Sequence, residues 1–182
     1  MARVFEGTDL KELDLSGCSK IKGNLSQLPP AVTSVNLGGC CELTGNLSSL
    51  PSSVTSLDLD ACSKIRGDLG VLGALNLTVL NLADCDQVKG EITPHMVAWL
   101  SGIRQKNLNG CGRLVLTGSK AKNEILITEV DLSNMDSLEG DLPNMNHHVT
   151  SFNLAGCRKV TGQISSLPAR CGNFEVAISF TK

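Results

Sequence analysis

Aliphatic residues return along this chain in a fixed order, and the order repeats about every 22 residues. The stretch Val54-Thr55-Ser56-Leu57-Asp58-Leu59 shows the pattern, with aliphatic residues at positions 1, 4 and 6 of the repeat. Leu57 and Leu59 have the two-residue spacing of side chains on one face of a β-strand. The pattern therefore predicts a short strand whose other face carries Ser56 and Asp58. Seven copies begin at Leu10, Val32, Val54, Leu77, Ile103, Ile127 and Val149.

Further features complete each copy, and we number them from its first aliphatic residue. A cysteine stands at position 9, an aliphatic residue at position 12 and a glycine at position 14, as in Cys62, Ile65 and Gly67. Leu-Pro pairs follow at 28–29, 50–51 and 167–168. The recurring glycine indicates a turn with positive φ or a close backbone approach. Because Leu-Pro favours extended backbone, we expect the return side of each copy to be mostly irregular.

A copy of this length cannot bury its own aliphatic side, so neighbouring copies must stack and cover one another. The stacked strands would form one parallel sheet with a rung about every 4.8 Å. The sequence therefore predicts a solenoid, in which function lies on a surface more often than in a pocket.

The repeat resembles that of the leucine-rich repeat family over nearly the whole chain. Leu13-Asp14-Leu15-x-x-Cys18 and Leu80-Asn81-Leu82-x-x-Cys85 carry the resemblance, and cysteine in place of the commoner asparagine looks like the cysteine-containing variety. The glycine and the Leu-Pro pairs look more like plant and bacterial subtypes. The resemblance implies an α/β solenoid: a leucine-rich repeat horseshoe with a parallel β-sheet on the concave face and a mostly irregular convex side. It also implies that the chain binds another protein.

The fourth copy departs from the others because it carries a helix signal. Thr93 is a favourable N-cap, Pro94 suits the first turn and Gly102 closes the segment, so we expect one helix near 94–101. We expect one domain over 1–182, with an N-terminal cap at 1–9, seven repeats at 10–170 and a C-terminal capping strand at 171–182. Alternation of apolar and polar residues from Phe174 to Phe180 indicates that strand.

Charge and composition exclude several classes of partner. The net charge is −2, which gives no strong electrostatic bias toward nucleic acid or a membrane, so neither is expected as a partner. No apolar run is long enough to span a membrane, and the first residues lack the apolar core of a signal peptide. We therefore expect a cytoplasmic protein that is monomeric in isolation. The alternative is a secreted protein whose signal peptide has been removed.

Six of the eight cysteines occupy position 9 of a copy: Cys18, Cys40, Cys62, Cys85, Cys111 and Cys157. Met135 takes this place in the sixth copy, and methionine cannot form a disulfide, so the column indicates packing. No cysteines have metal-site spacing, and we expect structural free thiols in a reducing compartment. Cys41 and Cys171 lie off the column: one of them could be exposed and reactive, or the two could pair with each other in a secreted protein. The glycosylation sequons at Asn24 and Asn46 recur with the repeat, and we interpret them as by-products of it.

The outward face of the predicted strands supplies the candidate binding residues. They are Glu12, Asp14, Asn36, Asp58, Asn81, Gln105, Lys106, Asn107, Glu129, Asp131 and Asn153. Position 5 is Asp or Asn in every copy, which suggests a polar, weakly acidic concave surface that accepts hydrogen bonds from a partner protein. The alternative is that these side chains bond to each other and to neighbouring strand ends. A uniform column without aromatic or arginine anchors favours that alternative.

Lys106 belongs to this set for a different reason, since position 4 is apolar in the other copies. A polar loop follows at 117–124, and together with the predicted helix it marks a distinctive patch in mid-chain. A basic edge between positions 9 and 14 is a further surface feature, which would attract an acidic partner or keep the molecule soluble. It comprises Lys20, Lys22, Lys64, Arg66, Lys89, Arg113, Arg158 and Lys159.

No arrangement of residues points to catalysis. The chain has no Gly-x-Ser-x-Gly, His-Glu-x-x-His or P-loop motif, and its histidines lack partners at ligand spacing. We therefore expect no catalytic residue, metal or cofactor. A non-enzymatic protein–protein interaction module is the leading hypothesis. The alternatives are a structural subunit of a larger assembly and a binder of a repetitive surface such as ice or a glycan. The last is suggested by Thr33, Thr55, Thr78, Thr128 and Thr150.

Overall fold

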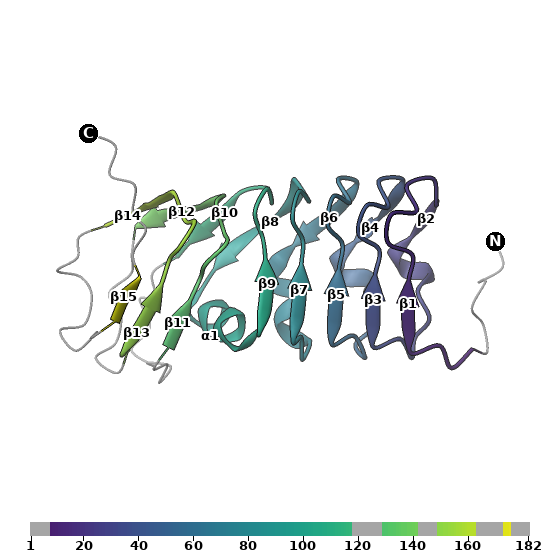
Figure 1. The fold of residues 1–182 in the computed structure, drawn as a ribbon, viewed down its shortest axis with the longest axis horizontal. Helices are drawn as coiled ribbons and strands as arrows, with labels where there is room; N and C mark the ends of the chain where they lie inside the picture. Colours follow the sequence, from purple (N-terminus) through teal and green to yellow (C-terminus); the bar gives the residue numbers. More distant parts are fainter. Residues whose placement is uncertain (1–7, 118–128, 142–148, 163–172, 176–182) are drawn as a thin grey trace.

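Short parallel strands make up most of this structure, a computed structural model that describes residues 8–117, 129–141, 149–162 and 173–175 (Figure 1). Every strand pairing among these residues is parallel. The described helices are the α-helix α1 (Pro94–Gly102) and the short 3-10 helices η1 (Leu25–Gln27), η2 (Leu47–Ser49) and η3 (Leu69–Ala74). The chain is therefore an α/β protein of open, parallel sheets with few helices.

Positions 3 to 5 of each copy form a strand, as the alternation predicts. The strands are β1 (Glu12–Asp14), β3 (Ser34–Asn36), β5 (Ser56–Asp58), β7 (Val79–Asn81), β9 (Gln105–Asn107), β11 (Glu129–Asp131) and β13 (Ser151–Asn153). One more strand, β15 (Asn173–Glu175), follows the seventh copy. The first five form a five-stranded sheet in chain order, and the last three form a three-stranded sheet. The register follows the repeat, so that Ser34 pairs with Ser56 and Leu57 with Leu80. β15 lies within the predicted C-terminal capping segment, whose remaining residues 171–172 and 176–182 fall outside the described ranges.

The return side is not mostly irregular, so that prediction was wrong. It contains a seven-stranded parallel sheet in the order β14-β12-β10-β8-β6-β4-β2, which lies behind the other two sheets in Figure 1. Its strands are β2 (Gly23–Asn24), β4 (Leu43–Asn46), β6 (Ile65–Asp68), β8 (Gln87–Ile92), β10 (Leu114–Leu116), β12 (Leu138–Asp141) and β14 (Lys159–Thr161). The sequence pattern missed them because they are short and most contain glycine, which is depleted from strands.

Glycine at position 14 lets these strands pass close to the preceding copy. Gly45 has a φ of 142°, and a Cβ there would lie 2.9 Å from both the backbone N and the Cβ of Leu25. One copy later, a Cβ on Gly67 would lie 3.2 Å from the backbone N of Leu47. At both glycines the structure thus combines the positive φ and the close approach that the sequence suggests for this position.

The helix predicted in the fourth copy is confirmed as α1. Thr93 caps it by accepting a hydrogen bond at Oγ1 from the backbone N of Met96 at 3.4 Å, and Pro94 fills the first turn, where its missing N–H costs nothing. The indole N of Trp99 donates to the carbonyl O of Leu75 at 3.0 Å. That bond fixes α1 against the end of η3, at the point where the fourth copy begins.

Aliphatic positions of neighbouring copies bury one another in one continuous cluster. In the third copy, positions 1, 4, 6, 9, 12 and 16 are all 0% exposed, as Val54, Leu57, Leu59, Cys62, Ile65 and Leu69. Burying one leucine or isoleucine side chain contributes about 1.5–3 kcal/mol, so this cluster is the main source of stability. The first copy is less covered, and its Ile21 is 39% exposed.

The stacking changes between the fifth and sixth copies. β9 and β11 are not paired, which is why the five-stranded and three-stranded sheets are separate. In the other copies the backbone N at position 6 donates to the carbonyl O at position 5 of the next copy, as Leu82 does to Asn107 at 2.9 Å. Leu108 instead donates to Asn134 at 3.0 Å, three residues beyond the equivalent Asp131 (134 − 131 = 3).

The seven-stranded sheet crosses this junction, but with a different register. Elsewhere position 14 of one copy aligns with position 12 of the next, as Gly90 does with Leu114. At the junction, Leu114 at position 12 of the fifth copy aligns with Leu138 at position 12 of the sixth copy. The register there differs from that of the other copies by two residues (14 − 12 = 2). In both layers the fifth copy therefore contacts residues of the sixth copy that lie two or three positions later than the repeat predicts. We call this offset the register shift.

Candidate functional site

The position 5 residues lie at the ends of the strands, in a column that the register shift interrupts between Asn107 and Asp131. Each accepts a hydrogen bond at Oδ1 from the backbone N two residues later, at 2.9 to 3.3 Å; the seven acceptors are Asp14, Asn36, Asp58, Asn81, Asn107, Asp131 and Asn153. This arrangement is an Asx turn, in which a side-chain oxygen serves as the acceptor where the strand ends. The turn explains why Asp and Asn, which strands disfavour, occupy every copy.

Bonds between copies also join this column. Asn36 Nδ2 donates to Asp14 Oδ2 at 3.2 Å, and Asn81 Nδ2 donates to Asp58 Oδ2 at 3.0 Å. The hydrogen bond from the backbone N of Ser16 is the main reason that the pKa of Asp14 lies below its ordinary value. The ladder considered above as the alternative to binding is therefore present at these rungs. Partner binding by the column stays a prediction, and it would use the lone pairs that the ladder leaves free.

Position 3 is the more accessible neighbour of this column. Glu12 and Gln105 are exposed, whereas Ser34 and Ser56 are half-buried between their neighbours. The side chain of Glu129, the other acidic candidate at position 3, lies outside the described residues. Gln105 gains its exposure at the edge where β9 lacks β11 as a partner.

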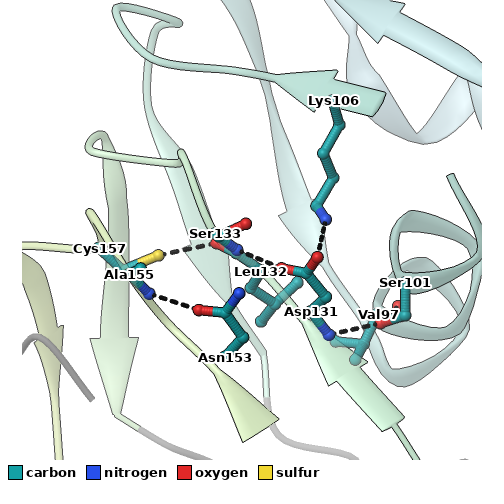
Figure 2. Close-up of polar contacts among 9 residues, drawn as sticks. All are labelled: Val97, Ser101, Lys106, Asp131, Leu132, Ser133, Asn153, Ala155 and Cys157. Atoms are coloured by element: carbon teal, nitrogen blue, oxygen red, sulfur yellow. Dashed lines mark hydrogen bonds and ion pairs between the residues drawn. The ribbon is translucent and has the colours of Figure 1, made fainter. Parts of the chain in front are cut away.

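Lys106 is not presented to a partner, which corrects its inclusion among the candidate binding residues. Its side chain is 3% exposed, and its Nζ lies 2.8 Å from Oδ2 of Asp131, whose side chain is 41% exposed (Figure 2). Partial burial opposes ionisation of Asp131. The hydrogen bonds from Lys106 and from the backbone and side chain of Ser133 outweigh that effect and hold the pKa of Asp131 below its ordinary value. Lys106 thus makes an internal ion pair across the junction.

Side chains also supply the hydrogen bonds that β9 and β11 do not make to each other. The backbone N of Asp131 donates to Ser101 Oγ at 2.9 Å, and Ser101 Oγ donates to the carbonyl O of Val97 at 2.7 Å (Figure 2). Both Val97 and Ser101 belong to α1, so the helix takes the place of a strand as the neighbour of β11. The mid-chain patch predicted from the sequence is therefore a structural junction, although its polar loop lies outside the described residues from 118 onward.

Asp136 and Asn109 form the second bridge across the junction. The backbone N of Gly110 donates to Asp136 Oδ1 at 2.9 Å, and the backbone N of Asp136 donates to Asn109 Oδ1 at 3.2 Å. Sequence reasoning missed Ser101, Asn109 and Asp136. Leu116 was the available signal, because it replaces the glycine that other copies have at position 14.

Five cysteines at position 9 are buried, and each donates its thiol to the carbonyl O at position 6 of the preceding copy at 2.9 to 3.3 Å. They are Cys40, Cys62, Cys85, Cys111 and Cys157. The carbonyl O of Leu37, for example, accepts both the backbone N of Cys40 at 3.0 Å and the thiol of Cys62 at 3.2 Å. These thiols therefore join the turns of neighbouring copies. Cys18 departs from the packing role predicted for the column, since it is exposed in the first copy.

Burial makes these thiols poor nucleophiles, because only the thiolate reacts. Desolvation is the largest cause in each case, and it raises the pKa of Cys62 and Cys111 to about 12 and that of Cys157 to about 11. The pKa values of Cys40 and Cys85 are raised for the same reason. At pH 8 a thiol with a pKa of 12 is only about one part in ten thousand thiolate.

Iodoacetamide at pH 8 is expected to alkylate Cys18 and Cys41 in the folded protein and to spare the five buried thiols. The reason is that Cys18 and Cys41 are exposed, while the others are covered and protonated. Peptide mass mapping after a timed reaction measures this, and the same reaction in concentrated urea is the control in which every thiol should react. Native-state alkylation of Cys62 at the rate of Cys41 would contradict the expectation.

The basic edge is exposed along its described length. Lys64 Nζ lies 2.9 Å from Glu42 Oε2, and Arg113 pairs with Glu139 on the neighbouring copy. Both pairs are substantially exposed, so solvent screens the attraction and they add little to stability. They weaken the positive field at this edge and do not form a pocket for an anion.

The part of the chain that the structure describes shows no chemistry beyond these contacts. Within it, no group of three or more His, Cys, Asp and Glu side chains is placed to hold a metal ion. His147 and His148 fall outside it. None of its helices has the length and apolar character needed to cross a membrane. In comparisons with known proteins, no family model matches the chain, and no curated protein is significantly similar to it.

Proposed function

We propose that the chain is a leucine-rich-repeat solenoid that binds another protein through the outward face of its five-stranded sheet. The in-register pairing of β1 to β9 supports the solenoid, because each of these strands comes from the same positions of successive copies. On this proposal the five-stranded sheet lines the concave side of the horseshoe. The seven-stranded sheet then lies on the convex side.

The negative charge of that face is the main observation that supports the binding role. Across β1 to β9, positions 3, 5 and 7 hold carboxylates at Glu12, Asp14, Asp58 and Asp60 and no lysine or arginine. The remaining residues at these positions are mostly short, such as Gly38 and Ala83, so a partner can approach the backbone closely. A polar segment of a partner that carries lysine, arginine or amide donors is complementary to this surface.

A site-specific photo-crosslink tests the proposal. A benzophenone amino acid replaces Ser56, at the centre of the five-stranded sheet, and in a matched control it replaces Arg66, which is exposed on the seven-stranded sheet. We expect the Ser56 variant to give one discrete adduct with a protein of the native extract, and the Arg66 variant to lack that adduct. Equal adducts from both positions, or none from Ser56, would count against binding through the concave face.

The threonine column gives less support to the alternative of a repetitive-surface binder. Thr33, Thr55 and Thr78 donate their hydroxyls to the carbonyl O of position 2 in the preceding copy, at 3.0, 3.3 and 3.2 Å. Their hydrogens are therefore used inside the protein, and only lone pairs face outward. Measurable thermal hysteresis or binding on a glycan array would nevertheless favour this alternative.

We also propose that the protein works in the cytoplasm, without a metal, a cofactor or a nucleic-acid partner. The free thiols of the described cysteines support a reducing compartment. The ladder of thiol-to-carbonyl bonds would be lost if these cysteines were oxidised in pairs.

A further inference from the structure

We propose that Lys106 selects the register shift. On this inference, the ion pair between Lys106 and Asp131 is a latch, which holds the sixth and seventh copies out of an in-register alignment with the fifth copy. The latch joins described residues on either side of the junction, and it would act whether or not the chain binds a partner.

Both sides of the junction are regular, so an in-register alignment is available to the chain. β9 pairs with β7 in the register of the repeat, and β11 pairs with β13 in the same way. The sixth copy keeps apolar residues at positions 4 and 6, as Val130 and Leu132, and both are buried. No feature of β11 itself distinguishes it from the strands that pair normally.

Lys106 is the feature that opposes this alignment. Position 4 side chains face the core, as the 0% exposure of Leu80 and the 2% exposure of Val130 show on either side. In the aligned register, Asp131 would stand beside Asn107 at position 5, and alternation along the strand would turn its carboxylate to the opposite face from Lys106. The ammonium would then be buried without a counter-charge, which is a strongly unfavourable state.

The register shift removes this conflict. It brings Asp131 Oδ2 within 2.8 Å of Lys106 Nζ while the lysine side chain stays 3% exposed. In place of a β9–β11 ladder, the side chains of Ser101 and Asp136 accept hydrogen bonds from the backbone N atoms of Asp131 and Gly110. One backbone bond, from Leu108 to the carbonyl O of Asn134, also crosses this layer. A change to the aligned register would exchange these bonds for a β9–β11 ladder and would move the β10–β12 pairing by two residues, while each copy keeps its own fold. The junction therefore has two possible registers, the aligned and the shifted one, and the buried Lys106 selects the shifted register.

Disulfide trapping tests the latch. Residues 105 and 129 occupy position 3 and would be direct neighbours only in the aligned register, at the roughly 4.8 Å spacing of paired strands, which a disulfide can bridge. Cysteines are introduced as Gln105→Cys and Glu129→Cys, with Cys18→Ser and Cys41→Ser to remove the exposed thiols. Oxidised glutathione accepts the two electrons. The matched control is Ser34→Cys with Ser56→Cys, a pair that is already aligned in β3 and β5.

We expect the control pair to crosslink, and the 105–129 pair to crosslink poorly while Lys106 is present. Adding Lys106→Leu should raise the yield of the 105–129 disulfide by at least about tenfold, because the register is then free to follow the repeat. Lys106→Met serves as a second variant if the leucine protein folds poorly, as judged by circular dichroism. Efficient 105–129 crosslinking with Lys106 present would overturn the proposal. So would an unchanged low yield in a folded Lys106→Leu or Lys106→Met protein.

Discussion

Replacing Leu57 by lysine is expected to lower the free energy of unfolding by about 4 kcal/mol or more. Leu57 occupies position 4 of the third copy and is 0% exposed, so the ammonium would enter the core. Lys106 occupies the same position of the fifth copy without this penalty, since Asp131 lies 2.8 Å from it. Urea denaturation followed by circular dichroism measures the loss. The free energy of unfolding of many domains is only about 5–15 kcal/mol in total, so the variant should be largely unfolded at a modest urea concentration.

Leu57→Met is the matched control, because methionine has a similar volume and no charge. It should cost less than about 1.5 kcal/mol. A Leu57→Lys protein that unfolds within about 1 kcal/mol of the natural one would show that position 4 tolerates lysine in general. Lys106 would then need no partner, and the structural role given to Asp131 would fall with it.

Replacing Gly112 by alanine is expected to lower the free energy of unfolding by about 3 kcal/mol. A Cβ at this position would lie 2.4 Å from the carbonyl O of Asp86 and 2.7 Å from the carbonyl O of Val88. Both atoms belong to the backbone of the fourth copy, so they cannot move aside as the end of a side chain can. The fifth copy would have to separate from the fourth, and the loss of stability is measured by thermal and urea unfolding.

Gly102→Ala is the control for this substitution. A Cβ there has no neighbour within 4 Å, and the residue lies at the end of α1. Alanine should therefore leave the stability unchanged or raise it by up to about 1 kcal/mol, as expected for a helical glycine. If Gly112→Ala behaved like Gly102→Ala, the close packing of the fourth and fifth copies would be refuted.

The predicted strands and the observed ones agree because both depend on neighbours in the sequence. Leu57 and Leu59 face inward wherever the chain is extended, and Asp58 then closes its own turn through the backbone N of Asp60 at 3.0 Å. Thr93 and Pro94 likewise begin α1 through contacts within one helical turn. Such local signals can be found in one copy of the repeat without knowledge of the next.

The candidate site was harder to predict, because its character depends on contacts between copies. The sequence pattern identifies the position 5 column, but the Asx turns and the bond from Asn81 to Asp58 are visible only in the tertiary structure. The seven-stranded sheet was missed for the same reason, since Gly23 pairs with Leu43 in the following copy and neither residue alone indicates a strand. Lys106 was recognised as unusual, but its partner 25 residues later was not (131 − 106 = 25).

The amino-acid sequence by itself determined the repeat, the inward and outward faces of its strands and the helix of the fourth copy. These follow from the period of side-chain directions and from capping, which act within a few residues. Only the tertiary structure decided the pairing of the return-side strands and the alignment of the fifth copy with the sixth. That alignment depends on contacts between residues far apart in the sequence, such as Lys106 and Asp131, which a pattern read within one copy does not contain.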